Sequence, residues 1–257
     1  MGVAEPAEQE RVLITGATSA IGGELALYYA KPGTELTLHG RNAAILEPLA
    51  ERCRQAGAQV QTYQLDLRDL DALHDWLSRC AAFDLVIVNA GMNIHVGPNG
   101  EPEVWEDTEL LLDINVKASL RVVQSVLPAM RAKGRGQIAL MSSLAAYFGL
   151  PTTPSYSASK AAVKAYGEGL RGWLAPEGIK VNVVMPGYVS SPMCDAMPGP
   201  KPFLWTPQRA AKRIARGLKA NKARISFPFP LNLGCWFLAV LPARVSVFIL
   251  SKIGYDA

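Results

Sequence analysis

Cysteine and histidine are scarce in this sequence. Its 257 residues include four cysteines and three histidines. The histidines do not cluster, and the cysteines show neither paired nor metal-type spacing. We therefore predict free thiols in a reducing compartment and no metal site. The cysteines are Cys53, Cys80, Cys194 and Cys235.

The chain also lacks long hydrophobic runs. No uninterrupted apolar run reaches the ~18 residues that a membrane-spanning helix needs. Residues 1–9 are acidic and do not follow the charged-then-apolar plan of a signal peptide. We expect a cytoplasmic protein, and a peripheral contact with the inner face of a membrane stays open.

A strong excess of one charge is absent too. The net charge is +4, and the basic residues are scattered except between Lys201 and Arg224. This distribution argues against a general nucleic-acid-binding surface. We predict no nucleic-acid partner.

Short apolar runs alternate with helical stretches along most of the chain. Apolar strands separated by helices predict a parallel sheet with helices on both faces. The predicted fold class is α/β: a single-domain, Rossmann-type, doubly wound parallel sheet that binds its ligand beyond the carboxyl ends of the strands. Strands are expected at 11–14, 35–39, 59–63, 85–88, 136–141 and 180–184. Helices are expected at 24–30, 45–56, 70–80 and 156–174, and one or two long helices at 107–131.

The first strand-to-helix turn is rich in glycine and small residues. A glycine can take a tight turn, and the free N–H groups at a helix start can hold a pyrophosphate. We predict a dinucleotide site here, with an ordinary strand–helix loop as the alternative. The predicted contacts are Gly16, Thr18, Ser19, Ala20, Ile21 and Gly22.

The end of the second strand bears on the choice of dinucleotide. NAD-binding sites usually have an acidic residue there, whereas this chain has Arg41 followed by Asn42. A guanidinium suits a ribose phosphate by charge and by its planar shape. The pattern predicts NADP(H) rather than NAD(H), unless Arg41 is simply a solvated surface residue.

Two further strand ends have residues suited to a nucleotide. Asp66, followed by Leu67, could accept a hydrogen bond from an adenine amino group, or could instead cap the helix that starts near Leu70. The segment Asn89-Ala90-Gly91 has small residues against which a flat nucleoside can lie, although Asn and Gly also favour turns.

Tyr156 and Lys160 are four residues apart in a predicted helix, which places them on one face. A free phenol titrates at about pH 10, so moving its pKa to neutrality takes roughly 4 kcal/mol. One cation at ~4 Å and an effective dielectric of ~20 supplies about that much. The pair is therefore a candidate acid–base centre, although Tyr and Lys at this spacing also occur on ordinary exposed helices.

The motifs in their order resemble those of the short-chain dehydrogenases/reductases. The resemblance runs from about Arg11 to Ser191, and Ala20 stands where the family usually has a glycine. Val88 likewise replaces the first asparagine of the family's Asn-Asn-Ala-Gly. The matching motifs are Thr15-Gly16-x-x-x-Ala20-Ile21-Gly22, Asn89-Ala90-Gly91, Asn115, Ser143, Tyr156-x-x-x-Lys160 and Pro186-Gly187.

The resemblance implies a role for each matching residue. Tyr156 would be the general acid–base, Lys160 would lower its pKa and hold the nicotinamide ribose, and Ser143 would bind the substrate oxygen. Asn115 would support a proton relay to the lysine. The nicotinamide carboxamide would lie against Pro186, Gly187 and Val189, and Ser191 falls where the family often has a threonine. A homodimer or homotetramer is also implied.

Residues 1–257 are predicted to form one catalytic domain. Its parts are a family core at 10–192, a substrate loop and basic helix at 193–225, and an apolar, helical C-terminal extension at 226–257. The extension has three interpretations: a lid and wall of the substrate pocket, a contact with a membrane surface, or a subunit interface or core packing. The first two imply an apolar or lipid-like substrate.

The sequence thus predicts an NADP(H)-dependent oxidoreductase that interconverts a carbonyl and a secondary alcohol. A 3-oxoacyl-carrier-protein reductase is an alternative, because the basic stretch near 212–224 could bind an acidic carrier. The alternative from another class is an NADP(H)-binding regulatory or scaffold protein without turnover.

Overall fold

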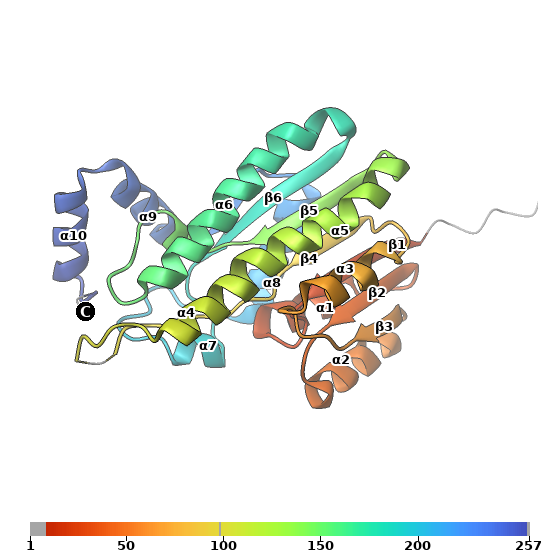
Figure 1. Ribbon diagram of the computed structural model, residues 1–257, viewed down its shortest axis with the longest axis horizontal. Coiled ribbons are helices and arrows are strands. Elements are labelled where there is room, and N and C mark those ends of the chain that lie inside the picture. Colours follow the sequence, from red (N-terminus) through yellow and green to blue (C-terminus); the bar gives the residue numbers. More distant parts are fainter. Residues whose placement is uncertain (1–8, 98, 256–257) are drawn as a thin grey trace, which may run out of the picture.

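The computed structural model describes residues 9–97 and 99–255, and it has one sheet of seven strands at its centre (Figure 1). Every neighbouring pair of strands is parallel, in the order β3-β2-β1-β4-β5-β6-β7. The strands are β1 (Glu10–Thr15), β2 (Thr34–His39), β3 (Gln59–Tyr63), β4 (Leu85–Val88), β5 (Gly136–Met141), β6 (Ile179–Pro186) and β7 (Arg224–Phe227).

Helices cover both faces of this sheet. In β1, Val12 and Ile14 pack on one side with α1, α2 and α8, and Leu13 packs on the other with α3, α5 and α6. Since neighbouring side chains of a strand point to opposite faces, an apolar run is buried throughout only when both faces are covered. These helices are α1 (Ala20–Tyr29), α2 (Ala43–Gln55), α3 (Leu70–Ser78), α5 (Ala118–Lys133), α6 (Pro154–Leu174) and α8 (Pro207–Lys219).

The predicted doubly wound fold is confirmed. The strand order reverses between β1 and β4, so the carboxyl ends of these two strands border the crevice in which such sheets bind ligands. The remaining helical segments are α4 (Trp105–Leu112), the π-helix η1 (Asp113–Lys117), the short 3-10 helices η2 (Leu144–Ala146) and η3 (Ala175–Glu177), α7 (Pro192–Asp195), α9 (Leu231–Val240) and α10 (Ala243–Lys252).

The sequence analysis missed strand β7. It treated the residues up to Arg224 as a basic stretch, whereas Arg224 already pairs with Val183 of β6. Ile225 and Phe227 are buried beneath α8. The predicted division at residue 225 therefore passes through a strand, and the C-terminal segment leaves the sheet after Phe227.

Of the one or two helices predicted at 107–131, the structure has two, α4 and α5, joined by η1. One turn of π-helix at Asp113–Lys117 separates α4 from α5 and contains the buried Asn115. Such insertions are common at functional sites.

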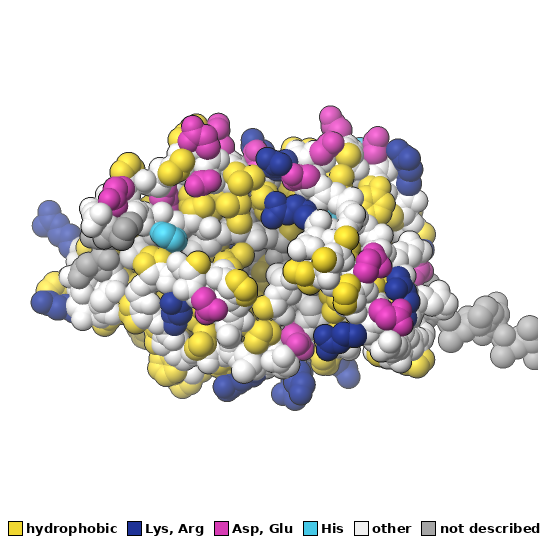
Figure 2. Space-filling model, turned by 90° about the horizontal axis from the view of Figure 1, so that it is seen from below, with side chains coloured by type: hydrophobic (Ala, Val, Ile, Leu, Met, Phe, Trp, Pro, Cys, Tyr) yellow, Lys and Arg dark blue, Asp and Glu magenta, His cyan; other side chains and the backbone are white. Residues whose placement is uncertain are grey.

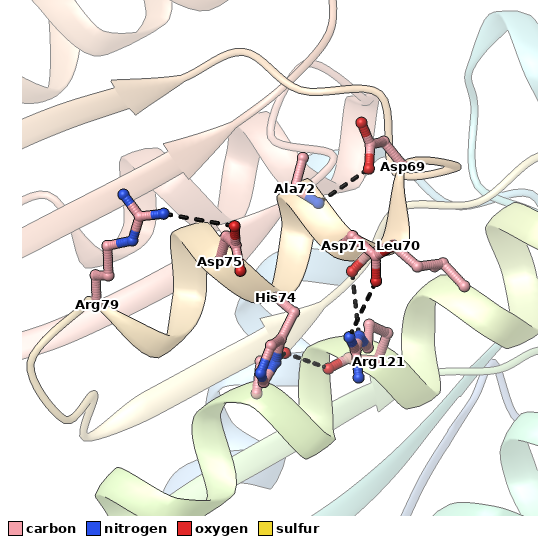
Figure 3. A network of polar contacts seen from close by, with 9 residues as sticks. Asp69, Leu70, Asp71, Ala72, His74, Asp75, Arg79 and Arg121 are labelled. Carbon is pink, nitrogen blue, oxygen red and sulfur yellow. Dashed lines mark hydrogen bonds and ion pairs between the residues drawn. The ribbon is translucent and has the colours of Figure 1, made fainter.

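The polar network between α3 and α5 shows how α3 begins (Figure 3). The Asp69 carboxylate caps α3 by accepting a hydrogen bond from the Ala72 N–H at 2.9 Å. Arg121 of α5 donates to the Leu70 carbonyl at 3.1 Å. Asp69, and not Asp66, therefore caps this helix, so the capping alternative for Asp66 is wrong.

Asn182 of β6 links this strand to β5 and to the segment before β7, and we predict that Asn182→Ala destabilises the fold. Its buried amide donates to the Lys222 carbonyl at 2.7 Å and accepts from Gln137 at 2.7 Å. Truncation removes both bonds, although Gln137 keeps its bond to the Leu218 carbonyl, and the loss should lower the free energy of unfolding by about 1–3 kcal/mol. Urea denaturation measures this, with the exposed Gln55→Ala as control. An unchanged urea midpoint for Asn182→Ala would contradict the assignment.

Candidate active site

Gly16 begins the turn between β1 and α1. Its φ is +64°, in the left-handed region that glycine adopts without strain. A Cβ at Gly16 would lie 2.7 Å from the Cα of Ala90, so the turn packs directly on the end of β4. The predicted tight turn is therefore present. A side chain at position 16 is excluded both by the positive φ and by the contact with Ala90.

The start of α1 forms a cradle for an anion. The Ser19 hydroxyl accepts the Gly22 N–H at 3.1 Å, and a Cβ on Gly22 would collide with the Gly16 carbonyl oxygen. The N–H groups of Ala20 and Ile21, at the first two positions of the helix, have no intrahelical carbonyl partner. A helix start of this kind favours phosphate groups.

Alanine at position 20 is compatible with this turn. Ala20 is the first residue of α1, and the non-glycine residues with positive φ in the described part of the chain are Phe203 and Asn221. The backbone at Ala20 therefore has a negative φ, which an alanine adopts without strain.

Asn89 holds the turn in place. Its side-chain amide donates to the carbonyls of Thr15 and Gly16 at 3.1 and 2.9 Å and to the Ser19 hydroxyl at 3.0 Å. Val88, where the family has its first asparagine, is buried in the core. The bonds that stabilise the turn therefore come from Asn89.

His39 supports the same turn from the end of β2, a role that the sequence analysis missed. The Gly16 N–H donates to His39 Nδ1 at 3.3 Å, so Nε2 must carry the proton that is shared with the Leu65 carbonyl at 2.9 Å. Burial lowers the pKa of His39. The ring is thus held neutral and joins β1, β2 and the segment after β3.

Arg41 and Asp66 lie near each other at the ends of β2 and β3. Arg41 is exposed. The pKa of Asp66 is lowered mainly by its hydrogen bond from Arg68, at 2.6 and 2.9 Å, and the charge of Arg41 contributes to the same shift. Asn42, predicted as a cofactor contact, caps α2 by accepting from the Ala44 N–H at 3.0 Å. The side chain of Leu67 is buried in the core.

Lys160 is the buried cation of the site. Only 5% of the residue is exposed, and its ammonium donates to the Met141 carbonyl at 3.1 Å. Burial lowers its pKa to about 8. A Cβ at Gly91 would lie 3.1 Å from Lys160 Nζ and 3.0 Å from Asn115 Oδ1, so glycine leaves room for both groups.

Asn115 is fixed by three hydrogen bonds. Its Oδ1 accepts the Met92 N–H at 2.8 Å, and its Nδ2 donates to the Met92 carbonyl at 2.9 Å and to Ser159 at 3.0 Å. The π-helical turn thus brings Asn115 of η1 against the loop after β4 and against α6. These contacts place it beside Lys160, where the resemblance expects it.

The electrostatic prediction for Tyr156 differs from the structure. Burial is the largest effect on the pKa of Tyr156 and raises it, while a hydrogen bond with Ser143 opposes the rise. Lys160 Nζ lies 5.7 Å from the Tyr156 ring centroid and is bonded to Met141 instead. The phenol is therefore protonated at neutral pH, because desolvation outweighs the hydrogen bond with Ser143.

One cavity of about 640 Å³ joins these parts. Figure 2 shows the molecule from below, with a hollow near the middle of this face and hydrophobic side chains around it. Most of the predicted site residues line the cavity. Those that do not are Gly16, Gly22, Arg41, Asn42, Asp66, Leu67, Ala90 and Asn115. The predicted residues in the lining are Thr18, Ser19, Ala20, Ile21, Asn89, Gly91, Ser143, Tyr156, Lys160, Pro186, Gly187, Val189 and Ser191.

Gly187 and Val189 are placed by backbone contacts. The Gly187 N–H donates to the Phe227 carbonyl at 2.7 Å, and Val189 forms an isolated parallel bridge with Trp205. Ser191 caps the short helix α7 by accepting from Cys194 at 3.1 Å. The segment from Pro186 to Pro207, which includes the start of the predicted substrate loop, is thus partly ordered by its contacts with β7 and by α7.

The sequence analysis overlooked a tyrosine pair in the cavity wall. The hydroxyls of Tyr188 and Tyr255 lie 2.7 Å apart, and Tyr255 donates to the Pro200 carbonyl at 2.9 Å. Tyr188 must then donate to Tyr255, which leaves its own oxygen free to accept. The position of Tyr188 directly after Gly187 was the available signal, but nothing local connects it with Tyr255.

The comparisons with known proteins agree on one family. A model of the short-chain dehydrogenases matches residues 10–199. An uncharacterized oxidoreductase of Myxococcus xanthus is 32% identical over 234 residues, 90% of this chain and 92% of that protein. An 11-beta-hydroxysteroid dehydrogenase-like protein of Arabidopsis thaliana is 33% identical over 227 residues, 84% and 73% of the two chains. The solved structure of a short-chain dehydrogenase from Sphingobium yanoikuyae in complex with NADPH is 27% identical, with a TM-score of 0.79 over 95% of this chain and 93% of that chain.

The buried ammonium of Lys160 generates a prediction about stability and pH. Because its pKa is about 8 when folded and about 10.4 in an unfolded chain, the unfolded state binds more protons between these values. The contribution of Lys160 to the free energy of unfolding therefore rises with pH across that window. Below it, the full cost of burying the ammonium is present.

We expect Lys160→Met to be more stable than the wild type at pH 7, by up to about 3 kcal/mol, less the lost bond to Met141. The difference in free energy of unfolding between the two proteins should become smaller as the pH rises towards 10. Urea unfolding of the ligand-free proteins at pH 7 and pH 9.5 tests this, with the exposed Lys219→Met as control. A difference in stability that does not change with pH would show that the charge of Lys160 is not its cause.

Proposed function

The chain belongs to the short-chain dehydrogenase/reductase family, and on that premise we propose that it is an NADP(H)-dependent enzyme that interconverts a carbonyl and a secondary alcohol on an apolar substrate. The family assignment makes it an NAD(P)-dependent oxidoreductase. The observation that carries the finer proposal is a shared cavity: Ser143, Tyr156 and Lys160 face the same space as the anion cradle and a wall of apolar residues.

The fit of a dinucleotide rests on the shape of the first turn. Gly16 and Gly22 leave no space for side chains, and the N–H groups of Ala20 and Ile21 point from the start of α1 towards a phosphate position. Arg41 is an exposed cation beyond the end of β2, with no carboxylate at that strand end. This arrangement supports a preference for a ribose that bears a phosphate.

In the reaction that we assign to the site, one residue transfers the proton and others hold the reacting oxygen and stabilise the charge. When bound, the nicotinamide supplies or accepts the hydride. In the reductive direction, Tyr156 donates its phenolic proton to the carbonyl oxygen as the hydride reaches the carbonyl carbon, and Ser143 holds that oxygen by a hydrogen bond. The raised pKa of Tyr156 keeps the proton available at neutral pH.

We assign the stabilisation of the phenolate that remains to Lys160, beside which Asn115 lies. The Lys160 ammonium is held on the far side of Gly91, where Asn115 keeps the loop after β4 in place. Its pKa of about 8 makes Lys160 able to release and recover a proton near neutral pH. We therefore assign to this pair the resupply of the proton to Tyr156.

The apolar class of substrate is supported by the cavity wall opposite Tyr156. That wall comes largely from the C-terminal segment, including Leu238, Leu241 and Leu250. Burial of apolar surface contributes roughly 25 cal/mol per Å², so such a wall favours substrates with an extended hydrocarbon part. The name of the hydroxysteroid dehydrogenase-like relative points in the same direction.

Replacing Tyr156 by Phe tests the reaction. We expect carbonyl reduction to fall by at least about a thousandfold, while NADPH binding stays within about twofold, because only the proton donor is lost. Tyr166→Phe, on the same helix α6, is the matched control and should keep its activity. NADPH oxidation and NADPH fluorescence measure the two quantities.

Undiminished turnover in Tyr156→Phe would refute the role of Tyr156. A wild-type protein that binds NADPH but reduces nothing in a panel of ketones and carrier-protein-bound 3-oxoacyl groups would favour the scaffold alternative. Activity restricted to the carrier-bound compounds would favour the 3-oxoacyl-carrier-protein reductase.

Replacing Arg41 by Ala tests the cofactor. Since a guanidinium–phosphate contact is worth roughly 1.5–3 kcal/mol, we expect NADPH to bind about tenfold or more weakly, with NADH binding unchanged. Fluorescence titration with both cofactors measures this, and the exposed Arg52→Ala on α2 is the control. Equal weakening of NADPH and NADH would remove Arg41 from the phosphate site.

A further inference from the structure

The last two helices expose an unusual amount of apolar surface. They leave the sheet after Phe227 and form a hairpin, α9 with α10, at one end of the molecule (Figure 1). Large apolar side chains on this hairpin are 41–76% exposed, although others of the same hairpin line the cavity. The exposed ones are Phe229, Leu233, Trp236, Phe237, Val240, Val245, Val247, Phe248 and Ile253.

The helix α10 has one inward and one outward face. Ser246 and Leu250 point inward, and the Ser246 hydroxyl donates to the Leu238 carbonyl at 2.8 Å, which joins α10 to α9. Arg244, Phe248 and Lys252 are spaced four residues apart and therefore form an outward stripe. Lys252 Nζ lies 5.6 Å from the Phe248 ring, so an aromatic side chain stands between two cations.

The same hairpin contributes to the rim of the cavity. Phe237 and Ile253 line the cavity and are also 48% and 53% exposed. Met193 of α7 does the same at 42% exposure. The mouth is therefore bordered by apolar side chains in contact with solvent, which is an unfavourable arrangement for an opening onto bulk water.

The charge of the hairpin has one sign. Between residues 225 and 255 the sequence contains Arg244 and Lys252 and no aspartate or glutamate. Within residues 9–97 and 99–255, no helix is long and apolar enough to cross a membrane. A surface that combines exposed aromatic and aliphatic groups with cations, without a spanning helix, suits the interface of a bilayer that contains anionic lipids.

We propose that the α9–α10 hairpin docks on an anionic lipid surface, with Phe248 inserted among the acyl chains and Arg244 and Lys252 at the phosphates. The rim residues Phe237, Ile253 and Met193 then face the lipid, and an apolar substrate passes between bilayer and cavity without crossing water. The docking stands independently of the reaction, whereas this substrate path rests on the proposed function.

A second copy of the chain fits this surface less well. In a twofold-symmetric dimer the same patch lies on both sides, so Arg244 and Lys252 would meet a described surface, residues 225–255, that contains no aspartate or glutamate. Such a contact would also cover the apolar rim of the cavity. Anionic lipid supplies the missing negative charge and leaves the rim open to apolar molecules.

Vesicle co-sedimentation of the full chain tests the docking. We expect the wild type to sediment with phosphatidylcholine vesicles that contain phosphatidylserine. Its affinity for pure phosphatidylcholine vesicles should be lower by about tenfold or more, because each cation near an anionic surface raises the affinity roughly fivefold. Phe248→Glu should weaken the binding to the anionic vesicles by about tenfold or more. Arg244→Gln with Lys252→Gln should remove the preference for phosphatidylserine.

The matched control is Trp173→Glu on α6, where an aromatic side chain is 58% exposed, close to the 62% of Phe248. It should bind vesicles like the wild type, and circular dichroism with thermal melting checks that each variant is folded. Failure of the wild type to sediment with the anionic vesicles at low salt would overturn the proposal. Equal losses of vesicle binding for Phe248→Glu and Trp173→Glu would also overturn it. So would a wild type that binds no vesicles and forms a dimer, seen by analytical ultracentrifugation, that Phe248→Glu dissociates. Since sedimentation needs no turnover, an inactive Tyr156→Phe that still binds vesicles separates docking from the reaction.

Discussion

The Asn89 amide joins the two strands at the centre of the sheet, and the geometry of the whole site depends on that junction. One side chain from the end of β4 binds two carbonyls and one hydroxyl of the turn after β1. The left-handed Gly16 and the uncapped N–H groups of Ala20 and Ile21 are held in position by these bonds. Because Gly91 follows two residues later, the same strand end also leaves the space that Lys160 and Asn115 share.

The site is built at a cost to stability. An ammonium at Lys160 is kept almost fully out of water with a backbone carbonyl as its hydrogen-bond partner, and its pKa falls to about 8. The phenol of Tyr156 is desolvated beside it, and its pKa rises. Burial thus moves apart two pKa values that are close together in water, with Lys160 below Tyr156, so proton transfer from the ammonium to a Tyr156 phenolate is favourable. This account replaces the simpler one in which the charge of Lys160 lowers the tyrosine pKa directly.

The C-terminal hairpin lines the cavity with one face and exposes apolar side chains on the other. Leu238 and Leu250 face inward towards the cavity and the Tyr188–Tyr255 pair, while Phe248 and its neighbours face outward. The apolar residues of α10 do not keep to one face of the helix, as expected for a helix that packs on the cavity wall and, in our proposal, docks on lipid with its other face. The pocket wall, one of the three interpretations of this segment, is therefore compatible with an external apolar contact.

The sequence by itself determined the doubly wound sheet, because each strand and helix has a local pattern: β4 is apolar throughout, and Tyr156 and Lys160 share a helix face at a spacing of one turn. The motif residues could also be placed at strand ends from sequence alone. Other features were decided only by tertiary structure. Strand β7 exists because β6 offers it a partner, Asp69 rather than Asp66 caps α3 because of where the chain turns, and Tyr188 meets Tyr255 across 67 residues. The direction of the Tyr156 pKa shift belongs to this second group, since desolvation depends on everything packed around a side chain and not on its neighbours along the chain.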